Sequence, residues 1–196
     1  RTKWFMGFLT LSVIGFLLSV QGDLLSVASG PLFIELSSCS VFWFLCFFAE
    51  AISGIAISDS LLLTYALLEL LTLSTYLLVG FWYAQPLVVT AARDAFLTKR
   101  VGDVPLLMGV VTLSTIAGSL NFSDLEKWAE TATLSPVFGT LLGLALIAAP
   151  TAKCAQFPFH LWLDEAMEGP NPASIMRNTV VVGAGAYVLI KLQPVL

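Results

Sequence analysis

The sequence predicts an all-α integral membrane protein, a polytopic helical bundle of about six crossings with one broken helix. The first observation is composition: 58% of the 196 residues are hydrophobic, only 11% are charged, and the mean hydropathy is +0.91. Soluble domains usually carry about a quarter charged residues, so we expect membrane lipid around this chain. The second observation is a long apolar helix interrupted by two prolines. The net charge of −4 arises from few groups and indicates no nucleic-acid partner.

The N-terminal part, residues 1–40, is the hardest to assign. Trp4 to Val20 is an apolar run just long enough to cross a membrane, and two basic residues precede it. The same features fit a cleaved signal peptide, although no clean small-residue cleavage site follows. Leu24 to Cys39 contains a Gly-Pro step and a glutamate, which favour a broken or peripheral helix. We therefore separate these N-terminal apolar segments from a membrane domain over residues 41–196.

Two crossings are predicted next. Val41 to Ser58 is strongly apolar and aromatic, with Glu50 near its middle. Ser58-Asp59-Ser60 offers helix N-cap oxygens ahead of a second helix, Leu61 to Trp82. That helix places Glu69 near mid-membrane, where a lone carboxylate must be protonated, paired with a cation or exposed to an internal water path. A neutral glutamic acid hydrogen-bonded within the bundle is the simpler alternative for both glutamates.

Polar connections then alternate with apolar helices. Tyr83 to Thr98 is predicted as a polar connection, and Val101 to Ser119 as the next crossing. Arg100 and Asp103 are three residues apart, so they can share a helix face and pair. Leu120 to Ser135 is predicted to be an amphipathic, mostly acidic loop before the next helix.

The stretch that organises the chain runs from Pro150 to Trp162. Val137 to Ala152 predicts an apolar helix, which Pro150 and Pro158 should kink or unwind, because proline removes a backbone donor and clashes one turn back. Inside a bilayer an unwound turn is tolerated only where protein or a water-filled cavity surrounds it. Lys153 therefore sits where a membrane helix breaks, and an ammonium there is a functional candidate.

The last predicted crossing, Ala173 to Leu192, follows a Gly-Pro-Asn-Pro breaker. Arg177 and Asn178 lie in its first two turns, and small residues further along allow close approach of a neighbouring helix. His160 is the only histidine of the chain, and a satisfied interior residue is a simpler interpretation than a ligand. The three cysteines lack CxxC spacing, so the sequence predicts no metal site.

Four stretches resemble one known family, in that family's order. They are Leu68 to Trp82, Thr98 to Asp103, Lys153 to Pro158 and Trp162 to Pro170. Together they look like the antiporter-like subunit 5, of the NdhF type, of respiratory complex I and its photosynthetic relative. The resemblance covers roughly Ala49 to Leu192, and it implies half of an antiporter-like inverted-repeat fold. Because that subunit is far longer than this chain, we expect a fragment of it.

The resemblance implies a proton-translocating membrane-arm subunit of an NAD(P)H- or ferredoxin-quinone oxidoreductase, in a thylakoid or bacterial inner membrane. The family's coupled, proton-translocating glutamate and lysine are matched by Glu69 and Lys153. Arg100 and Asp103 match a family motif that lies toward the neighbouring subunit. The resemblance implies no redox cofactor in this chain. Quinone, iron-sulfur clusters and NAD(P)H or ferredoxin would act elsewhere in the complex, and other membrane-arm subunits would be partners.

The chain departs from the family pattern near its end. The family usually has a proline where this sequence has Asp164, and a histidine where it has Asn178. The stretch between them looks more like a cyanobacterial variant used in carbon dioxide uptake, which implies a peripheral carbon dioxide-hydration subunit as a partner. Arg177 cannot shuttle protons in place of that histidine, because guanidinium does not deprotonate in this range. It could hold a bicarbonate or a carboxylate, Glu165 or Glu168.

Two other functions stay open on the sequence. A subunit of a multi-subunit sodium/proton antiporter would share this ancestry and the same glutamate and lysine. The variant-like stretch after Asp164 argues against that function. A structural fragment, whose helices pack without conducting ions, is the second alternative.

Overall fold

The computed structural model describes residues 30–164, 174–175 and 177–196, with side chains from residue 42 onward. Every regular element within these residues is a helix, which confirms the all-α prediction. The α-helices are α2 (Gly30–Ile57), α3 (Leu61–Val79), α4 (Pro86–Ala117), α5 (Phe122–Thr131), α6 (Pro136–Lys153), α7 (Leu161–Asp164) and α9 (Val182–Leu192). The predicted Trp4 to Val20 crossing lies outside the described residues.

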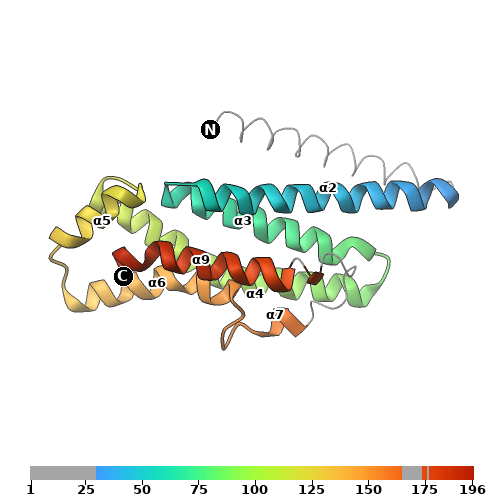
Figure 1. Cartoon of the computed structure of the whole chain (residues 1–196). Coiled ribbons are helices and arrows are strands. Elements are labelled where there is room, and N and C mark those ends of the chain that lie inside the picture. The colour runs from blue at the N-terminus through green and yellow to red at the C-terminus, as the bar shows by residue number, and fades with distance from the viewer. Residues whose placement is uncertain (1–29, 165–173, 176) are drawn as a thin grey trace.

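The long helices lie side by side along one axis of an elongated bundle (Figure 1). The most extensive packing joins α4 to α6 and α2 to α3, and α9 runs along α6. The short helix α5 lies at one end of the bundle, in the connection between α4 and α6 (Figure 1). Helix α4 therefore stands between α3 and α6, and residues on its two sides reach different neighbours.

Three helical segments of the described chain are long and apolar enough to cross a membrane: Leu61–Trp82, Pro86–Ala117 and Pro136–Lys153. A shorter apolar helix covers Phe42–Ile57. Large apolar side chains lie exposed on the outer faces of α4 and α6, among them Met108, which is 66% exposed. An outer surface of this kind suits lipid, so the structure agrees with the predicted integral membrane protein.

The predicted polar connection over Tyr83 to Thr98 is wrong. Helix α4 begins at Pro86 and continues without interruption to Ala117. This one helix contains most of the predicted connection and most of the predicted Val101 to Ser119 crossing. Proline fits the first turn because the amide there has no helical partner. The charged residues of this segment conceal an amphipathic pattern whose buried face is made of small apolar side chains, namely Val88, Ala91, Ala92 and Ala95.

Two further boundaries differ from the prediction. Helix α2 runs unbroken from Gly30 to Ile57, so no break separates the predicted Leu24 to Cys39 segment from the following crossing. The predicted loop over Leu120 to Ser135 contains helix α5, whose Leu125 side chain is fully buried. Together with the partly buried Phe122 and Trp128, Leu125 anchors this short amphipathic helix at the bundle end.

The start of α3 is supported differently from the expected N-cap. Ser60 does occupy the N-cap position, but its side chain makes no capping hydrogen bond. Instead the Leu61 amide donates to the Leu120 carbonyl at 2.8 Å, and the Phe122 amide donates to the Asp59 carbonyl at 2.9 Å. The backbone that follows α4 therefore provides the hydrogen bonds at the start of α3 that the sequence predicted from a serine or aspartate side chain.

The predicted break after the proline-bearing helix is confirmed. Pro150 lies inside α6, which ends at Lys153, and the chain becomes helical again only at Leu161. Ala155, just past the helix end, has a φ of 51°, a left-handed conformation that turns the chain away from the helix axis. The last crossing also starts irregularly, because a π-helical turn over Arg177–Val181 precedes α9.

Candidate functional site

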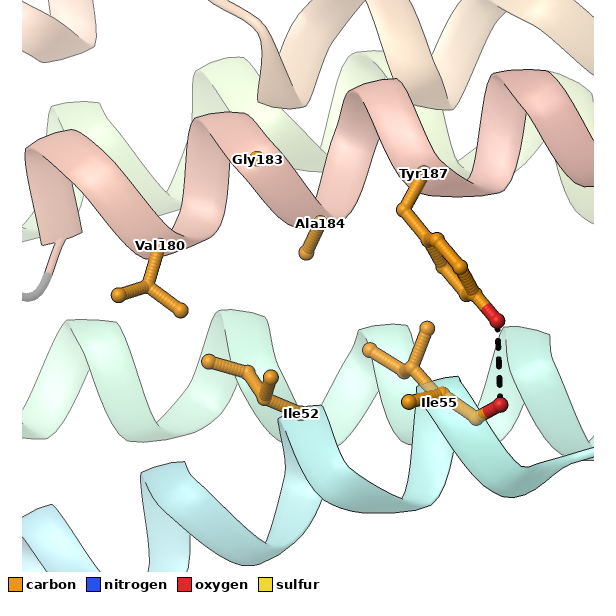
Figure 2. Close-up of a pocket in the computed structure, with 7 residues that line it drawn as sticks. Ile52, Ile55, Val180, Gly183, Ala184 and Tyr187 are labelled. Carbon is orange, nitrogen blue, oxygen red and sulfur yellow. Dashed lines mark hydrogen bonds between the residues drawn. The ribbon is translucent and has the colours of Figure 1, made fainter.

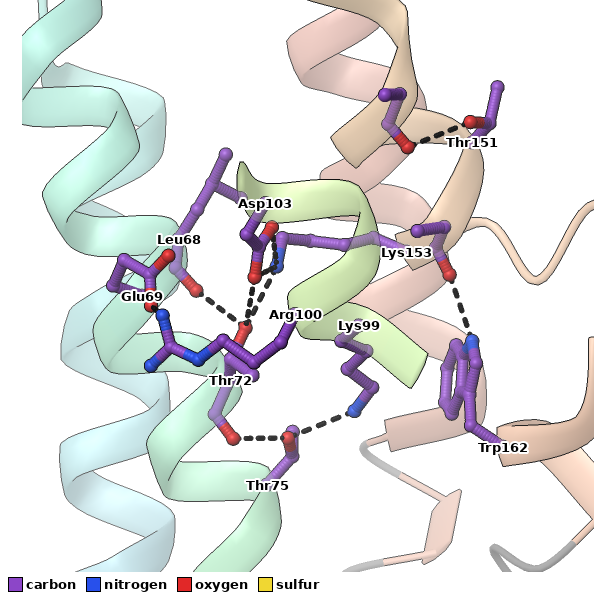
Figure 3. Close-up of polar contacts among 12 residues, drawn as sticks. Leu68, Glu69, Thr72, Thr75, Lys99, Arg100, Asp103, Thr151, Lys153 and Trp162 are labelled. Atoms are coloured by element: carbon purple, nitrogen blue, oxygen red, sulfur yellow. Dashed lines mark hydrogen bonds and ion pairs between the residues drawn. The ribbon is translucent and has the colours of Figure 1, made fainter. Parts of the chain in front are cut away.

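A buried ion pair joins the end of α6 to the middle of α4 (Figure 3). Lys153 Nζ lies 2.8 Å from Asp103 Oδ1 and 3.0 Å from Asp103 Oδ2, and both side chains are only 1% exposed. The lysine thus uses both carboxylate oxygens in the bundle interior. Because removing either partner would leave an uncompensated buried charge, each residue depends on the other.

A threonine on α3 completes the surroundings of this pair. Lys153 Nζ donates a hydrogen bond of 2.8 Å to Thr72 Oγ1, and the Thr72 hydroxyl donates to the Leu68 carbonyl at 2.9 Å. A longer contact of 3.4 Å joins Thr72 Oγ1 to Asp103 Oδ2. One ammonium is therefore held by groups from α3 and α4 while its own backbone belongs to α6.

Glycines let the surrounding helices come close enough for these contacts. A Cβ atom on Gly102 would clash with the Ala152 side chain and lie 2.9 Å from the Ala148 carbonyl oxygen. A Cβ atom on Gly185 of α9 would lie 3.2 Å from Lys153 Cβ. The predicted close approach through small residues of the last crossing thus occurs at Lys153 itself.

A second ion pair lies beside the first. Arg100 NH1 contacts Glu69 Oε2, and the two side chains are 36% and 17% exposed. The Arg100 guanidinium also lies over the Phe96 ring, 4.8 Å from its centroid. The other oxygen of Glu69, Oε1, accepts no hydrogen bond from the residues that the structure describes.

The structure therefore distributes the four expected residues over two pairs that the sequence did not predict. Glu69 is paired with Arg100 rather than Lys153, and Asp103 is paired with Lys153 rather than Arg100. Arg100 and Asp103 do share one stretch of α4, but each reaches a different neighbouring helix (Figure 3).

Sequence reasoning missed Lys99, a second buried lysine of the network. It is 2% exposed, its Nζ donates to Thr75 Oγ1 at 3.0 Å, and it lies 4.2 Å from the centre of the Trp162 ring. The signal that could have found it is its position four residues before Asp103, which is the same face of a helix. That signal was hidden because Lys99 falls between the predicted Tyr83 to Thr98 connection and the predicted Val101 to Ser119 crossing, so neither element included it.

Trp162 fastens the broken end of α6. Its side chain is fully buried, and its Nε1 donates to the Ala152 carbonyl at 2.8 Å. Ala152 is next to Lys153, and its carbonyl, in the last turn of α6, also accepts a longer hydrogen bond of 3.3 Å from the Ala155 amide. Trp162 thus gives the carbonyl beside the lysine a shorter hydrogen bond than the Ala155 amide does, while its ring lies against Lys99 (Figure 3).

Replacing Trp162 with phenylalanine should therefore lower stability by more than about 1 kcal/mol, since the indole hydrogen bond is lost and the smaller phenyl ring leaves part of a fully buried space empty. Thermal unfolding of the detergent-solubilised protein measures this change. Trp82→Phe is the matched control, because Trp82 is 48% exposed and makes no such bond to a carbonyl of α6. Equal melting temperatures of the two variants would contradict the fastening role.

Of the remaining predicted residues, Arg177 and Asn178 lie in the π-helical turn before α9. Arg177 is 2% exposed, and its guanidinium nitrogens find no hydrogen-bond partner among the described residues. Asn178 Oδ1 is likewise buried without a described partner. Glu165 and Glu168 lie outside the described residues, so their expected pairing with Arg177 stays a prediction.

The interpretation of His160 as an interior residue is wrong. It is exposed on the connection between α6 and α7, and its ring stacks against Phe157 with centroids 6.0 Å apart. The break turns this part of the chain outward, so the residue leaves the apolar helix that the sequence suggested.

Potential metal ligands and a pocket are the remaining features of the described chain. In these parts of the chain, no three His, Cys, Asp or Glu side chains gather in a way that could hold a metal ion. A pocket of about 210 Å³ lies between α2 and α9 (Figure 2). It is lined by apolar side chains and Tyr187, whose hydroxyl donates to the Ala56 carbonyl at 3.1 Å. That contact helps to join α9 to the end of α2.

Comparison with known proteins gives a consistent result. A profile of the transmembrane family described as NADH:quinone oxidoreductase/Mrp antiporter matches residues 58–196. The chain is 73% identical over 150 residues to NAD(P)H-quinone oxidoreductase subunit 5, organellar chromatophore 2, of Paulinella chromatophora, covering 76% of this chain and 24% of that protein. It is 39% identical over 158 residues to the chloroplastic subunit 5 of Agrostis stolonifera and of Zea mays, covering 78% of this chain and 21% of each relative. The chain thus spans about a quarter or less of the length of these relatives.

Proposed function

Because this chain belongs to the NADH:quinone oxidoreductase/Mrp antiporter transmembrane family, we propose that it is a proton-translocating part of membrane-arm subunit 5 of an NAD(P)H- or ferredoxin-quinone oxidoreductase. The observation that carries the proposal is the buried ion pair of Lys153 and Asp103 at the break of α6. Quinone, iron-sulfur clusters and the electron donor act elsewhere in the complex. Other membrane-arm subunits are its partners, in a thylakoid or bacterial inner membrane.

The mechanism that we propose is an exchange of partners by Lys153. Its flexible side chain leaves the last turn of a broken helix, where it already bonds to Thr72 on α3. Glu69 lies three residues before Thr72 on the same helix, and its Oε1 accepts no hydrogen bond from a described residue. Glu69 is therefore the carboxylate that we expect Lys153 to reach when it leaves Asp103.

Each exchange changes which carboxylate holds a proton. A carboxylate that loses its cation in a low-dielectric interior binds a proton more strongly, and one that gains a cation releases it. A change of about 1.4 kcal/mol in such a contact corresponds to one pKa unit. Quinone chemistry elsewhere in the complex would drive protons through this subunit if it biased the partner that Lys153 selects.

Lys153→Met tests this function in the assembled complex. Donor-driven acidification of inverted membrane vesicles should fall to background while quinone reduction continues, because methionine fills the space without carrying a proton. Lys127→Met is the matched control, since Lys127 is exposed on α5. A native gel reports assembly of both complexes.

A second variant covers the case in which Lys153→Met does not assemble. Combining it with Asp103→Asn removes both charges of the buried pair, so the interior is neutral at this point again. This double variant should assemble and reduce quinone without pumping. Normal pumping by either variant would leave the chain as a scaffold, which is the structural-fragment alternative.

The sodium/proton antiporter alternative is supported by the family itself, whose description includes the Mrp antiporters. The same pair of Lys153 and Asp103 could exchange a sodium ion against protons. Cation exchange in membranes that lack the electron-transfer arm distinguishes the two functions. Sodium-driven acidification there would favour the antiporter, and its absence would favour the oxidoreductase subunit.

We further propose that the complex is of the carbon dioxide-uptake type, with a peripheral carbon dioxide-hydration subunit. Support comes from the variant-like stretch from Asp164 to Asn178, and from buried Arg177, whose guanidinium could bind a bicarbonate or carboxylate. Deleting this subunit should stop inorganic-carbon uptake by whole cells while leaving respiratory NAD(P)H oxidation in place. Unchanged uptake would remove this part of the proposal.

A further inference from the structure

Lys99 is a buried lysine without a buried counter-charge. Its contacts are the Thr75 hydroxyl at 3.0 Å and the face of the Trp162 ring at 4.2 Å. Among the residues that the structure describes, no carboxylate lies within ion-pair distance of it. A hydroxyl and a ring offset only part of the cost of burying a full charge, so the charge of this lysine depends on the charged groups around it.

The surroundings of Lys99 link its charge to Lys153. The charged groups that act on it are Asp103 on its own helix, Lys153 on α6 and Arg177 before α9. Only Asp103 attracts a cation at this position, and in the structure Asp103 is occupied by Lys153. Thr72 and Thr75, one turn apart on α3, accept the hydrogen bonds of the two lysines (Figure 3).

We propose that Lys99 is a second proton-binding residue of this site, charged when Lys153 leaves Asp103 and neutral when Lys153 returns. The inference rests on the proposed function, since it requires Lys153 to exchange partners. When Lys153 moves away, Asp103 keeps its charge one turn from Lys99 on the same face of α4. When Lys153 returns, two buried ammonium groups compete for one carboxylate, and Lys99 gives up its proton.

The step is a simple proton transfer. On protonation an N–H bond forms at Lys99 Nζ as an O–H bond of a water molecule or a carboxylic acid breaks, and the reverse transfer restores the amine. Lysine suits this task because its ammonium deprotonates when buried, whereas arginine stays charged. Trp162 acts as a positioning residue, since its bond to the Ala152 carbonyl fixes the ring on which Lys99 rests.

Two substitutions of Lys99 in the full complex separate proton binding from packing. Lys99→Gln keeps a donor for Thr75 but carries no exchangeable charge, and Lys99→Arg keeps the charge but does not release it. We expect both to lower the number of protons pumped per quinone reduced by about tenfold or more, with quinone reduction retained. A structural role for the charge alone predicts normal pumping by Lys99→Arg.

Thr75→Val provides an independent readout if either lysine variant does not assemble. Loss of the hydroxyl removes the only hydrogen-bond acceptor that the described residues offer to Lys99. The charged form of Lys99 is then less stable relative to the neutral form, so the pH profile of pumping moves to lower pH. The same profile measured on Thr90→Val, an exposed threonine of α4, is the control. An unchanged profile in Thr75→Val would overturn the inference.

The outcomes also distinguish this inference from the proposed function. Normal pumping by Lys99→Gln together with loss of pumping in Lys153→Met overturns the role of Lys99 and leaves the proposed function standing. Normal pumping by both variants overturns the proposed function. Loss of pumping in Lys99→Gln and in Lys99→Arg, with assembly and quinone reduction intact, supports the inference.

Discussion

Asp103→Asn is expected to destabilise the protein by about 3–5 kcal/mol, because it leaves the Lys153 ammonium buried without its carboxylate. Lys153 and Asp103 are each only 1% exposed, so water cannot take over the lost interaction. The yield of assembled complex on a native gel and the thermal unfolding of the solubilised protein measure the effect.

The same helix supplies the control for this substitution. Arg93 and Asp94 form an ion pair of 2.9 Å on α4, with side chains that are 62% and 38% exposed. Asp94→Asn should cost no more than about 1 kcal/mol, since solvent screens exposed pairs. If Asp103→Asn melted at the same temperature as Asp94→Asn, the buried pair would not exist as described.

A double-mutant cycle then separates stability from function. Asp103→Asn combined with Lys153→Met removes both buried charges, so part of the lost stability should return, although pumping should not. A double variant that is no more stable than Asp103→Asn alone would mean that packing, rather than unpaired charge, causes the loss.

The position of Lys153 could be predicted from the sequence because its cause is local. Proline acts on its own helix, so Pro150 and Pro158 indicate a break wherever that helix lies. The partner of Lys153 has no local cause. Whether it meets Glu69 or Asp103 depends on which turns of α3, α4 and α6 face one another, and only the packed helices determine that.

The burial of Lys99 could not be predicted, although its cause is also local. Its chain neighbours Arg93, Asp94 and Arg100 make the segment look polar, and a polar segment between apolar runs resembles a membrane connection. The small residues Ala91, Ala92 and Ala95 carry the helical signal, but alanine contributes little to an apolar pattern. The all-α class needed no such detail, because overall composition alone predicts it.

Gly102→Ala is expected to have the second large effect, because the contact between α4 and α6 has no room for a methyl group. The added Cβ atom would meet the Ala152 side chain and would lie 3.3 Å from Ala149 Cα. Backbone atoms cannot yield as a flexible side chain would, so the helices must separate, at a cost of about 1–3 kcal/mol or more. Asp103 is the next residue, and separation would lengthen its contact with Lys153.

Gly139→Ala isolates this packing effect from helix propensity. Gly139 lies inside α6, and a Cβ atom there would meet nothing within 4 Å. Alanine in a helix interior is favoured over glycine by about 1 kcal/mol, so Gly139→Ala should match or exceed the native melting temperature. Gly102→Ala should melt well below it and pump poorly, because the added methyl group would force α4 and α6 apart. If the two alanine variants behaved alike, the close approach of α4 and α6 would not control the position of the Lys153 and Asp103 pair.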